Sequence, residues 1–159
     1  MTRGGPAVTR GDGNRVLILH GPNLNLLGTR EPEIYGHQTL EDIHDEISRR
    51  AVQLDMQVVF FQSNHEGALI DFLQAQAVDA IGLIINPGGL THTSVSLRDA
   101  LLAVARPFVE VHLTDPSTRE PFRKVNFLAD VAIASIVGHG PRGYTEALEL
   151  LAKRFPRRG

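Results

Sequence analysis

Short, almost continuously apolar segments recur along this chain, separated by stretches with helical spacing. Val16–Leu19, Val58–Phe61 and Ala80–Ile85 are three such segments, and two more follow at 108–113 and 131–137. A strand that is apolar at nearly every position is buried on both faces, which is typical of a parallel sheet covered by helices. The alternation of strand and helix therefore predicts right-handed crossovers and a three-layer α/β sandwich.

We expect five strands, with the first extended to residue 20, and four helices between and after them. The first helix follows Thr39, which can cap it together with Asp42. Its apolar stripe is Leu40, Ile43, Ile47, Ala51 and Leu54. The other helices are expected at 65–77, 94–104 and 144–155. About five strands in ~145 residues favour the flavodoxin-like strand order 2-1-3-4-5, which places a crevice beyond the carboxyl ends of the first and third strands.

Composition limits the protein to a few classes. A chain of 159 residues that is 42% hydrophobic can form one domain, which we place at 15–159, after an N-terminal extension at 1–14 that we expect to be disordered. The net charge is -2, so the chain does not have the excess of basic residues that is typical of nucleic-acid-binding proteins. The absence of cysteine excludes disulfides and thiolate sites. No apolar run reaches the roughly 18–20 residues of a membrane span, so we expect a cytoplasmic protein.

The segment Gly21–Gly36 follows the first strand and is too irregular in sequence for a helix or a strand. Pro22 and Pro32 interrupt backbone hydrogen bonding, and a long loop in a compact domain is usually a binding loop or a lid. It carries Arg30 and Tyr35. A nearby cation would favour the phenolate of Tyr35 as a base, although an aromatic that fastens the loop to the core is the commoner arrangement.

Polar side chains also follow the third strand and occupy the fourth. Glu110 and His112 are two residues apart on a strand and so share one face, where a carboxylate can orient an imidazole and favour its protonated form. Asn86 and His92 flank a Pro-Gly-Gly turn. The alternative for Glu110 and His112 is an ion pair that only stabilises the strand end. The alternative for Asn86 and His92 is a tight strand-to-helix turn without a ligand. The two histidines lack an evident third metal ligand, which disfavours a metal site.

Two further pairs depend on helical spacing. Arg119 and Arg123 would share a helix face and could hold a carboxylate, unless they form a solvated basic surface. In the helix at 94–104, the inward positions are expected to be Val95, Leu97 or Leu101, and Leu102. Arg98 and Asp99 would then point towards a partner subunit.

Taken together, these motifs resemble type II 3-dehydroquinate dehydratase, the shikimate-pathway enzyme that works without a Schiff base. The resemblance covers 16 to about 152 and rests on ordered motifs: GPNLNLLGTREPEIYG, QSNHEG, INPGGLTHTS, SLRDAL, EVHL, REPFR and GYTEAL. It implies a lyase that converts 3-dehydroquinate to 3-dehydroshikimate through an enolate. A catalytically weak paralogue or a non-enzymatic flavodoxin-like module is the alternative. However, the segment HGPNLN after the first strand has no acidic cluster, which a receiver domain would need. It also lacks the Ser/Thr/Gly-rich phosphate loop of a flavin binder.

The resemblance also implies catalytic roles. Tyr35 corresponds to the base that removes a proton beside the ketone, and Arg30 to the arginine that favours its phenolate. Asn23 corresponds to an asparagine that positions a water at the enolate oxygen. His112 corresponds to the acid that protonates the departing hydroxyl, and Glu110 to the carboxylate that orients it.

By the same resemblance, the substrate is bound by another set of residues: Asn86, His92, Asp99, Leu113, Thr114 and Arg123. Asp99 would reach the site of a neighbouring subunit, in a dodecamer built as a tetramer of trimers, and no cofactor or metal is implied. The chain departs from the family pattern at His20, where asparagine is usual, and at Leu90, Asp115, Val125–Asn126 and His139.

Overall fold

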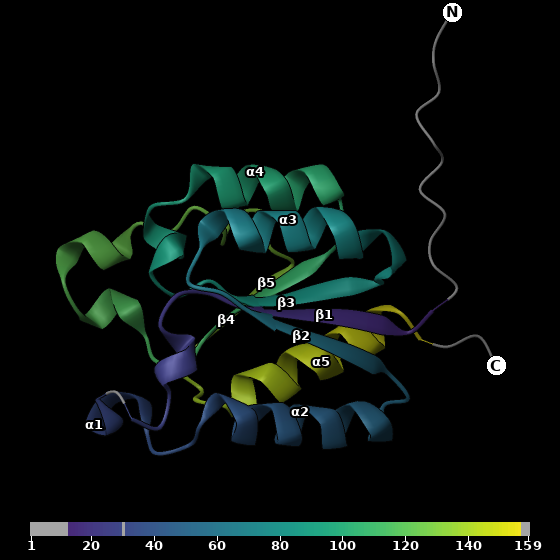
Figure 1. Ribbon diagram of the computed structural model, residues 1–159, viewed down its shortest axis with the longest axis horizontal. Coiled ribbons are helices and arrows are strands. Elements are labelled where there is room, and N and C mark those ends of the chain that lie inside the picture. The colour runs from purple at the N-terminus through teal and green to yellow at the C-terminus, as the bar shows by residue number, and fades with distance from the viewer. Residues whose placement is uncertain (1–12, 30, 157–159) are drawn as a thin grey trace, which may run out of the picture.

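The computed structural model describes residues 13–29 and 31–156, and within them five parallel strands form one sheet. The strands are β1 (Arg15–His20), β2 (Gln57–Gln62), β3 (Gly82–Asn86), β4 (Phe108–His112) and β5 (Ala134–Val137). They lie in the order β2-β1-β3-β4-β5 (Figure 1). The predicted flavodoxin-like order is therefore confirmed. The expected extension at 1–14 lies outside the described residues except for its last two.

Helices cover both faces of the sheet. Figure 1 shows α3 (Glu66–Gln76) and α4 (Val95–Val104) on one face, with α2 (Leu40–Gln53) and α5 (Arg142–Arg154) on the other. A short helix, α1 (Pro32–Tyr35), precedes α2. Five 3₁₀ turns complete the described structure: Leu24–Leu26, Ala77–Asp79, Gly88–His92, Pro116–Thr118 and Pro121–Lys124. None of the described helices is both long and apolar enough to cross a bilayer.

The all-apolar strands are buried because alternate side chains enter two separate cores. Val16 and Ile18 of β1 pack with the α2–α5 layer, whereas Leu17 and Leu19 pack with the α3–α4 layer. β3 and β4 are buried along their whole length. Each fully buried aliphatic side chain contributes roughly 1.5–3 kcal/mol relative to an exposed one. This double burial fixes the sheet and hence the positions of the strand ends.

The predicted cap of α2 is present. Thr39 accepts a hydrogen bond from the backbone of Asp42, and the carboxylate of Asp42 accepts one from the backbone of Thr39, both at 3.1 Å. This reciprocal capping box satisfies backbone donors that the first turn leaves unpaired. Ile43, Ile47 and Ala51 of the expected stripe are buried.

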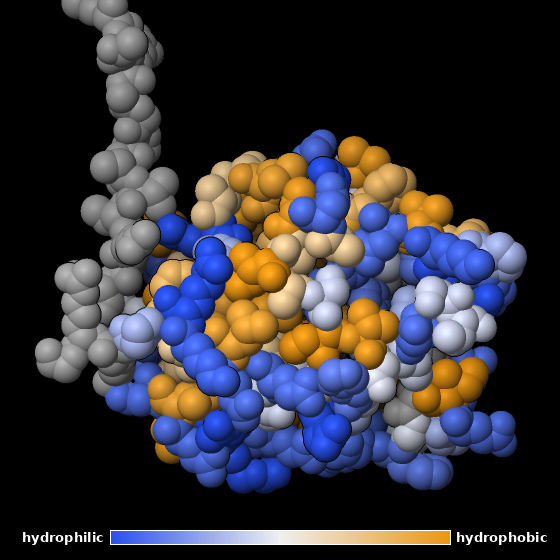
Figure 2. Space-filling view, turned by 180° about the vertical axis from the view of Figure 1, so that it is seen from behind, coloured by the Kyte–Doolittle hydropathy of each residue, from blue (hydrophilic) through white to orange (hydrophobic). Residues whose placement is uncertain are grey.

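The inward face of α4 was only partly predicted. Leu97 and Leu101 are buried, but Val95 is 53% and Leu102 is 50% exposed. At 3.6 residues per turn, Val95 and Leu102 lie away from the stripe that Leu97 and Leu101 direct at the sheet. Figure 2 shows the molecule from behind. Apolar side chains gather in its upper half, on the α3–α4 side, while its lower edge is mostly polar.

Two further expectations about secondary structure were wrong, and one possibility was not realised. The segment Gly21–Gly36 contains a 3₁₀ turn and α1, whose first residue is Pro32, a position where proline is favoured because its missing N–H is not needed. β5 begins at Ala134 rather than at 131. The shared helix face considered for Arg119 and Arg123 required a helix there. Instead, Arg119 follows the 3₁₀ turn Pro116–Thr118 and Arg123 lies in the turn Pro121–Lys124, because Pro121 starts a new turn.

Candidate active site

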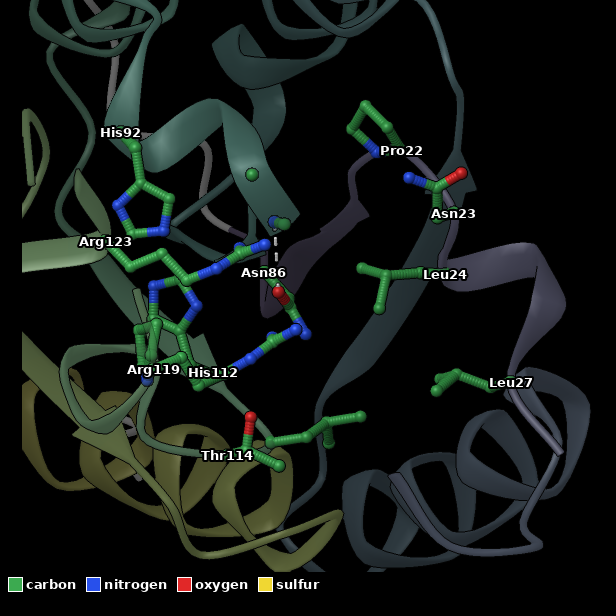
Figure 3. Close-up of a pocket in the computed structure, with 14 residues that line it drawn as sticks. Pro22, Asn23, Leu24, Leu27, Asn86, His92, His112, Thr114, Arg119 and Arg123 are labelled. Carbon is green, nitrogen blue, oxygen red and sulfur yellow. Dashed lines mark hydrogen bonds between the residues drawn. The ribbon is translucent and has the colours of Figure 1, made fainter. Parts of the chain in front are cut away.

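A cavity of about 190 Å³ opens beyond the carboxyl ends of β1, β3 and β4 (Figure 3). Its lining brings together seven residues that the sequence analysis assigned to the site: Asn23, Asn86, His92, His112, Leu113, Thr114 and Arg123. Pro22, Leu24, Leu27, Gly88, Gly89, Pro116 and Arg119 complete it. The cavity therefore occupies the switch point of the sheet, where open α/β folds bind ligands.

Two glycines let the loops after β1 and β3 meet at this cavity. The backbone N–H of Gly21 donates to the carbonyl of Asn86 at 2.8 Å. A Cβ on Gly21 would lie 2.3 Å from the carbonyl oxygen of Pro87, closer than side chains tolerate. Gly88 has φ of +58°, and its Cβ would lie 3.0 Å from the Pro22 carbonyl. Glycine is required here because two backbones approach with no room for a side chain.

Glu110 and His112 form a buried ion pair at the end of β4. His112 Nε2 lies 2.5 Å from Glu110 Oε1, and Glu110 is fully buried. The same oxygen accepts from Thr91 Oγ1 at 2.7 Å and from Asn126 Nδ2 at 2.8 Å. Burial acts to raise the pKa of Glu110, but the hydrogen bond and charge of His112, helped by Thr91 and Asn126, bring that pKa below its ordinary value. Glu110 is therefore an anion at neutral pH.

This arrangement fixes the orientation of His112. A carboxylate only accepts hydrogen bonds, so Nε2 of His112 carries a proton directed at Glu110. Nδ1 is left for a ligand in the cavity, because no described residue hydrogen-bonds to it. An imidazolium whose charge is balanced by a buried carboxylate can donate its Nδ1 proton to a departing oxygen.

His92 and Asn86 are each held by a backbone group. His92 Nδ1 lies 2.6 Å from the carbonyl oxygen of Val125, so Nδ1 carries the proton and Nε2 can accept from a ligand. The Oδ1 atom of Asn86 accepts from the N–H of Gly88 at 3.2 Å, and its Nδ2 donates to the hydroxyl of Tyr144 at 3.0 Å. Both side chains are thus positioned before any substrate binds.

Arg119 and Arg123 supply positive charge at one side of the cavity. Arg123 Nε binds Glu120 at 2.5 Å, and both arginines line the cavity. In Figure 3 their side chains extend towards Asn86. Guanidinium groups bind carboxylates through paired hydrogen bonds, so this edge can bind an anionic ligand.

Three predicted site residues are not placed in the cavity. Arg30 lies outside the described residues, as does the side chain of Tyr35, whose backbone ends α1. Asp99 is exposed on α4 and does not line the cavity of its own chain. Its neighbour Arg98 is engaged within the chain, because it donates to the carbonyl of Phe127 at 2.9 Å and pairs with Asp130.

Sequence reasoning missed the groups that support the ion pair and Asn86. Thr91, Asn126 and Tyr144 carry this support, yet they lie on separate segments, and no spacing along the chain links them to Glu110 or Asn86. Asn126 belongs to a departure from the family pattern and becomes a donor to Glu110. Asp115, another departure, binds the backbone of Ser117 at 2.9 Å and lies outside the cavity lining.

The sequence matches a known family over most of its length. A sequence model described as "Dehydroquinase class II" matches residues 14–152. The chain is 54% identical over 138 residues to a 3-dehydroquinate dehydratase of Halothermothrix orenii, covering 87% of this chain and 93% of that protein. It is 55% identical over 140 residues to 3-dehydroquinate dehydratase 1 of Ralstonia nicotianae, covering 87% and 90% respectively.

Solved structures agree with the sequence match. The crystal structure of a type II dehydroquinase from Butyrivibrio crossotus superposes with a TM-score of 0.85 at 39% identity, covering 89% of this chain and 99% of that one. A second, from Propionibacterium acnes, gives a TM-score of 0.84 at 33% identity, covering 89% and 97%. Family match, sequence identity and fold coincide over the residues that build the cavity, and the chain therefore belongs to the class II dehydroquinase family.

Proposed function

We propose that this protein dehydrates 3-dehydroquinate to 3-dehydroshikimate in the shikimate pathway, with the Glu110–His112 pair as its proton donor. Its relatives at 54% and 55% identity are named 3-dehydroquinate dehydratases. The buried ion pair in the cavity carries the proposal at the level of the site. A carboxylate at 2.5 Å from an imidazole, next to two cavity-lining arginines, suits the protonation of a leaving group on an anionic substrate.

The reaction consists of two proton transfers around an enolate. A base takes the proton from the carbon beside the ketone, and the electron pair of that bond moves to the ketone oxygen. The enolate then re-forms the ketone, its electrons make the new carbon–carbon double bond, and the hydroxyl leaves as water after taking a proton from His112. We assign the base to Tyr35, activation of its phenolate to Arg30, and the water-mediated contact with the enolate to Asn23, each from the family resemblance.

The remaining cavity residues hold the substrate. Asn86 and His92 are assigned to substrate hydroxyls, since each offers a fixed hydrogen-bonding atom. Leu113 and Thr114 are assigned to the substrate carboxylate through backbone and hydroxyl groups, together with Arg123. Arg119, considered with Arg123 in the sequence analysis as a carboxylate-binding pair, also lines the cavity. Two cations near one anionic group favour binding of the charged substrate.

We also propose that the protein works in the cytoplasm as a dodecamer, a tetramer of trimers, in which Asp99 enters the cavity of a neighbour. The exposed positions of α4 support an interface there. Val95 and Leu102 are half-exposed apolar side chains, and Asp99 is exposed between them. Residues spaced by three or four along a helix share a face, so a partner covering this face would meet all three.

The direct test is the enone absorbance that appears when 3-dehydroquinate is converted. His112→Asn removes the acid and should lower kcat at least ~10²-fold. The matched control is His139→Asn, because His139 is an exposed histidine paired with Glu146 at 2.7 Å and does not line the cavity. It should keep the wild-type rate. Equal rates for wild type and His112→Asn would refute the assigned acid, and no enone from wild type would refute the activity.

Two further treatments test the proposal that the reaction needs neither a metal nor a Schiff base. Activity should survive a chelator, and it should survive borohydride added with substrate, because no Schiff base is formed. Lys124 and Lys153 are the only lysines of the chain, and neither lines the cavity. Inactivation by borohydride in the presence of substrate would contradict this mechanism.

A further inference from the structure

Four side chains form a continuous hydrogen-bonded network from the surface of α2 to the cavity. His44 Nε2 lies 2.9 Å from His20 Nε2, and His20 Nδ1 lies 3.0 Å from the hydroxyl oxygen of Tyr144. That oxygen also accepts from Asn86 Nδ2 at 3.0 Å. His20, Tyr144 and Asn86 are buried, whereas His44 is half-buried. The network therefore joins α2, β1 and α5 to the one member that lines the cavity.

One backbone donor sets the direction of every bond in this network. The N–H of Gly88 can only donate, so the Asn86 atom 3.2 Å from it must be the oxygen. Nδ2 of Asn86 must then donate to Tyr144, which gives its own proton to Nδ1 of His20. His20 consequently carries its single proton on Nε2 and donates to Nε2 of His44. His44 is left with its proton on Nδ1.

We propose that His20 and Tyr144 are positioning residues that hold the amide of Asn86 in one orientation towards the substrate. This inference rests on the proposed function, because it assumes that Asn86 contacts substrate. With one Nδ2 proton given to Tyr144 and one lone pair of Oδ1 given to Gly88, Asn86 presents one remaining N–H and one remaining lone pair to the cavity. A rotated amide would exchange these two atoms.

The groups around the two histidines keep both neutral at pH 7. Burial, followed by the charge of His44, lowers the pKa of His20 to about 3. Burial also lowers the pKa of His44, against the opposing effect of Asp45 on the same helix. The other neighbours are Tyr144 from α5 and the ring of Phe60 from β2, which stacks on His44 at 3.9 Å. A proton added to Nε2 of His44 would face the proton of His20 Nε2, so protonation breaks the network.

Neutron diffraction from crystals of the full chain, exchanged into deuterated buffer near pH 7, tests the direction of the network. We expect deuterium on His20 Nε2 and His44 Nδ1, and none on His20 Nδ1. Deuterium on His20 Nδ1 would overturn the proposal, since Tyr144 could then no longer donate to His20. This measurement does not depend on activity, so it decides on the network even if the wild type fails to convert 3-dehydroquinate, a result that would overturn the proposed function instead.

A double-mutant cycle tests whether Tyr144 acts through Asn86. Tyr144→Phe removes only the hydroxyl and should raise KM for 3-dehydroquinate about 3- to 10-fold, the range expected for one oriented hydrogen bond, with kcat within about threefold. In an Asn86→Ala background the same change should alter KM less than twofold. The control is Thr145→Val, which removes the neighbouring hydroxyl of α5, bonded only to the Arg142 carbonyl among the described residues. An equal rise in KM in both backgrounds would show that Tyr144 has only a structural role.

A second pair of variants covers the case in which Tyr144→Phe does not fold. His44 is half-buried, so substitutions there are tolerated more readily. His44→Gln offers His20 an amide oxygen as acceptor and should keep KM within twofold of wild type. His44→Leu leaves the buried N–H of His20 without an acceptor and should raise KM about 3-fold or more. The proposal is overturned if the two variants have the same KM.

Discussion

Replacing Glu110 with glutamine separates the charge of this side chain from its hydrogen bonds. Three donors converge on Oε1, from His112, Thr91 and Asn126. Among the described residues, Oε2 has only the hydroxyl of Ser135, at 3.4 Å. An amide oxygen at the Oε1 position can accept from the same donors, and the amide NH₂ at the Oε2 position can donate to Ser135. Glu110→Gln should therefore fold, because no buried donor loses its acceptor.

The lost charge should appear in catalysis. A hydrogen bond to a charged group contributes roughly 1.5–3 kcal/mol, about 1 kcal/mol more than a hydrogen bond between neutral groups. The imidazole and carboxylate here are in direct contact at 2.5 Å. In Glu110→Gln, His112 keeps a hydrogen-bond partner but loses the negative charge beside the proton that it transfers, so kcat should fall. At pH 7, kcat should fall by about 10-fold, the factor that corresponds to ~1.4 kcal/mol.

Enone formation at pH 7 measures kcat, and urea unfolding at the same pH checks the fold. Glu110→Gln should lose at most about 1.5 kcal/mol of its free energy of unfolding, because every donor keeps an acceptor and only the charge is lost. Glu110→Ala serves as the contrast, since it leaves three donors without an acceptor and should lose roughly 3–5 kcal/mol. If Glu110→Gln keeps the wild-type kcat, the carboxylate charge has no part in the proton transfer and the reasoning fails.

Three further predictions follow from other parts of the molecule. Ala105 ends α4 with φ of 53°, a conformation that costs an alanine ~1–2 kcal/mol. Ala105→Gly should therefore stabilise the fold by ~0.5–1 kcal/mol and raise Tm by ~1–4 °C in a thermal melt. His20 stays neutral in the fold because burial and His44 lower its pKa to about 3; the unfolded chain binds a proton there below pH ~6.5, so stability is complete above that pH and should fall towards pH 3 by up to ~1.4 kcal/mol per unit. Urea unfolding at several pH values should show a shallower loss for His20→Asn, and an equal slope would contradict the assignment. Asp99→Ala should lower kcat/KM at least ~10-fold while sedimentation shows an unchanged oligomer, whereas a fully active monomer would reject the shared site.

The sequence by itself determined the layers and the strand order. Val16–Leu19 and Ala80–Ile85 are almost continuously apolar, which is typical of strands in a sheet buried on both faces. Glu110 and His112 could be paired in advance because two residues on one strand always share a face. Local rules also predicted the Thr39–Asp42 cap, since a capping box needs only neighbours in the chain.

Local spacing was insufficient elsewhere. The inward face of α4 was misjudged at Val95 and Leu102, because an apolar residue on a helix can face either the core or a partner. The helix that would have let Arg119 and Arg123 share a face is absent, because two 3₁₀ turns take its place, although both arginines line the cavity.

Only the tertiary structure decided which distant groups support the site. Thr91 and Asn126 come from two separate segments and both donate to Glu110. Tyr144, which hydrogen-bonds to Asn86, lies 58 positions further along the chain. Hydrogen bonds of this kind leave no periodic trace in a sequence, because each partner is set by how loops and helices pack over the strand ends. The sequence determined which strands bear the reacting side chains, while packing between layers determined the tautomer of His20, the orientation of Asn86 and the charge of Glu110.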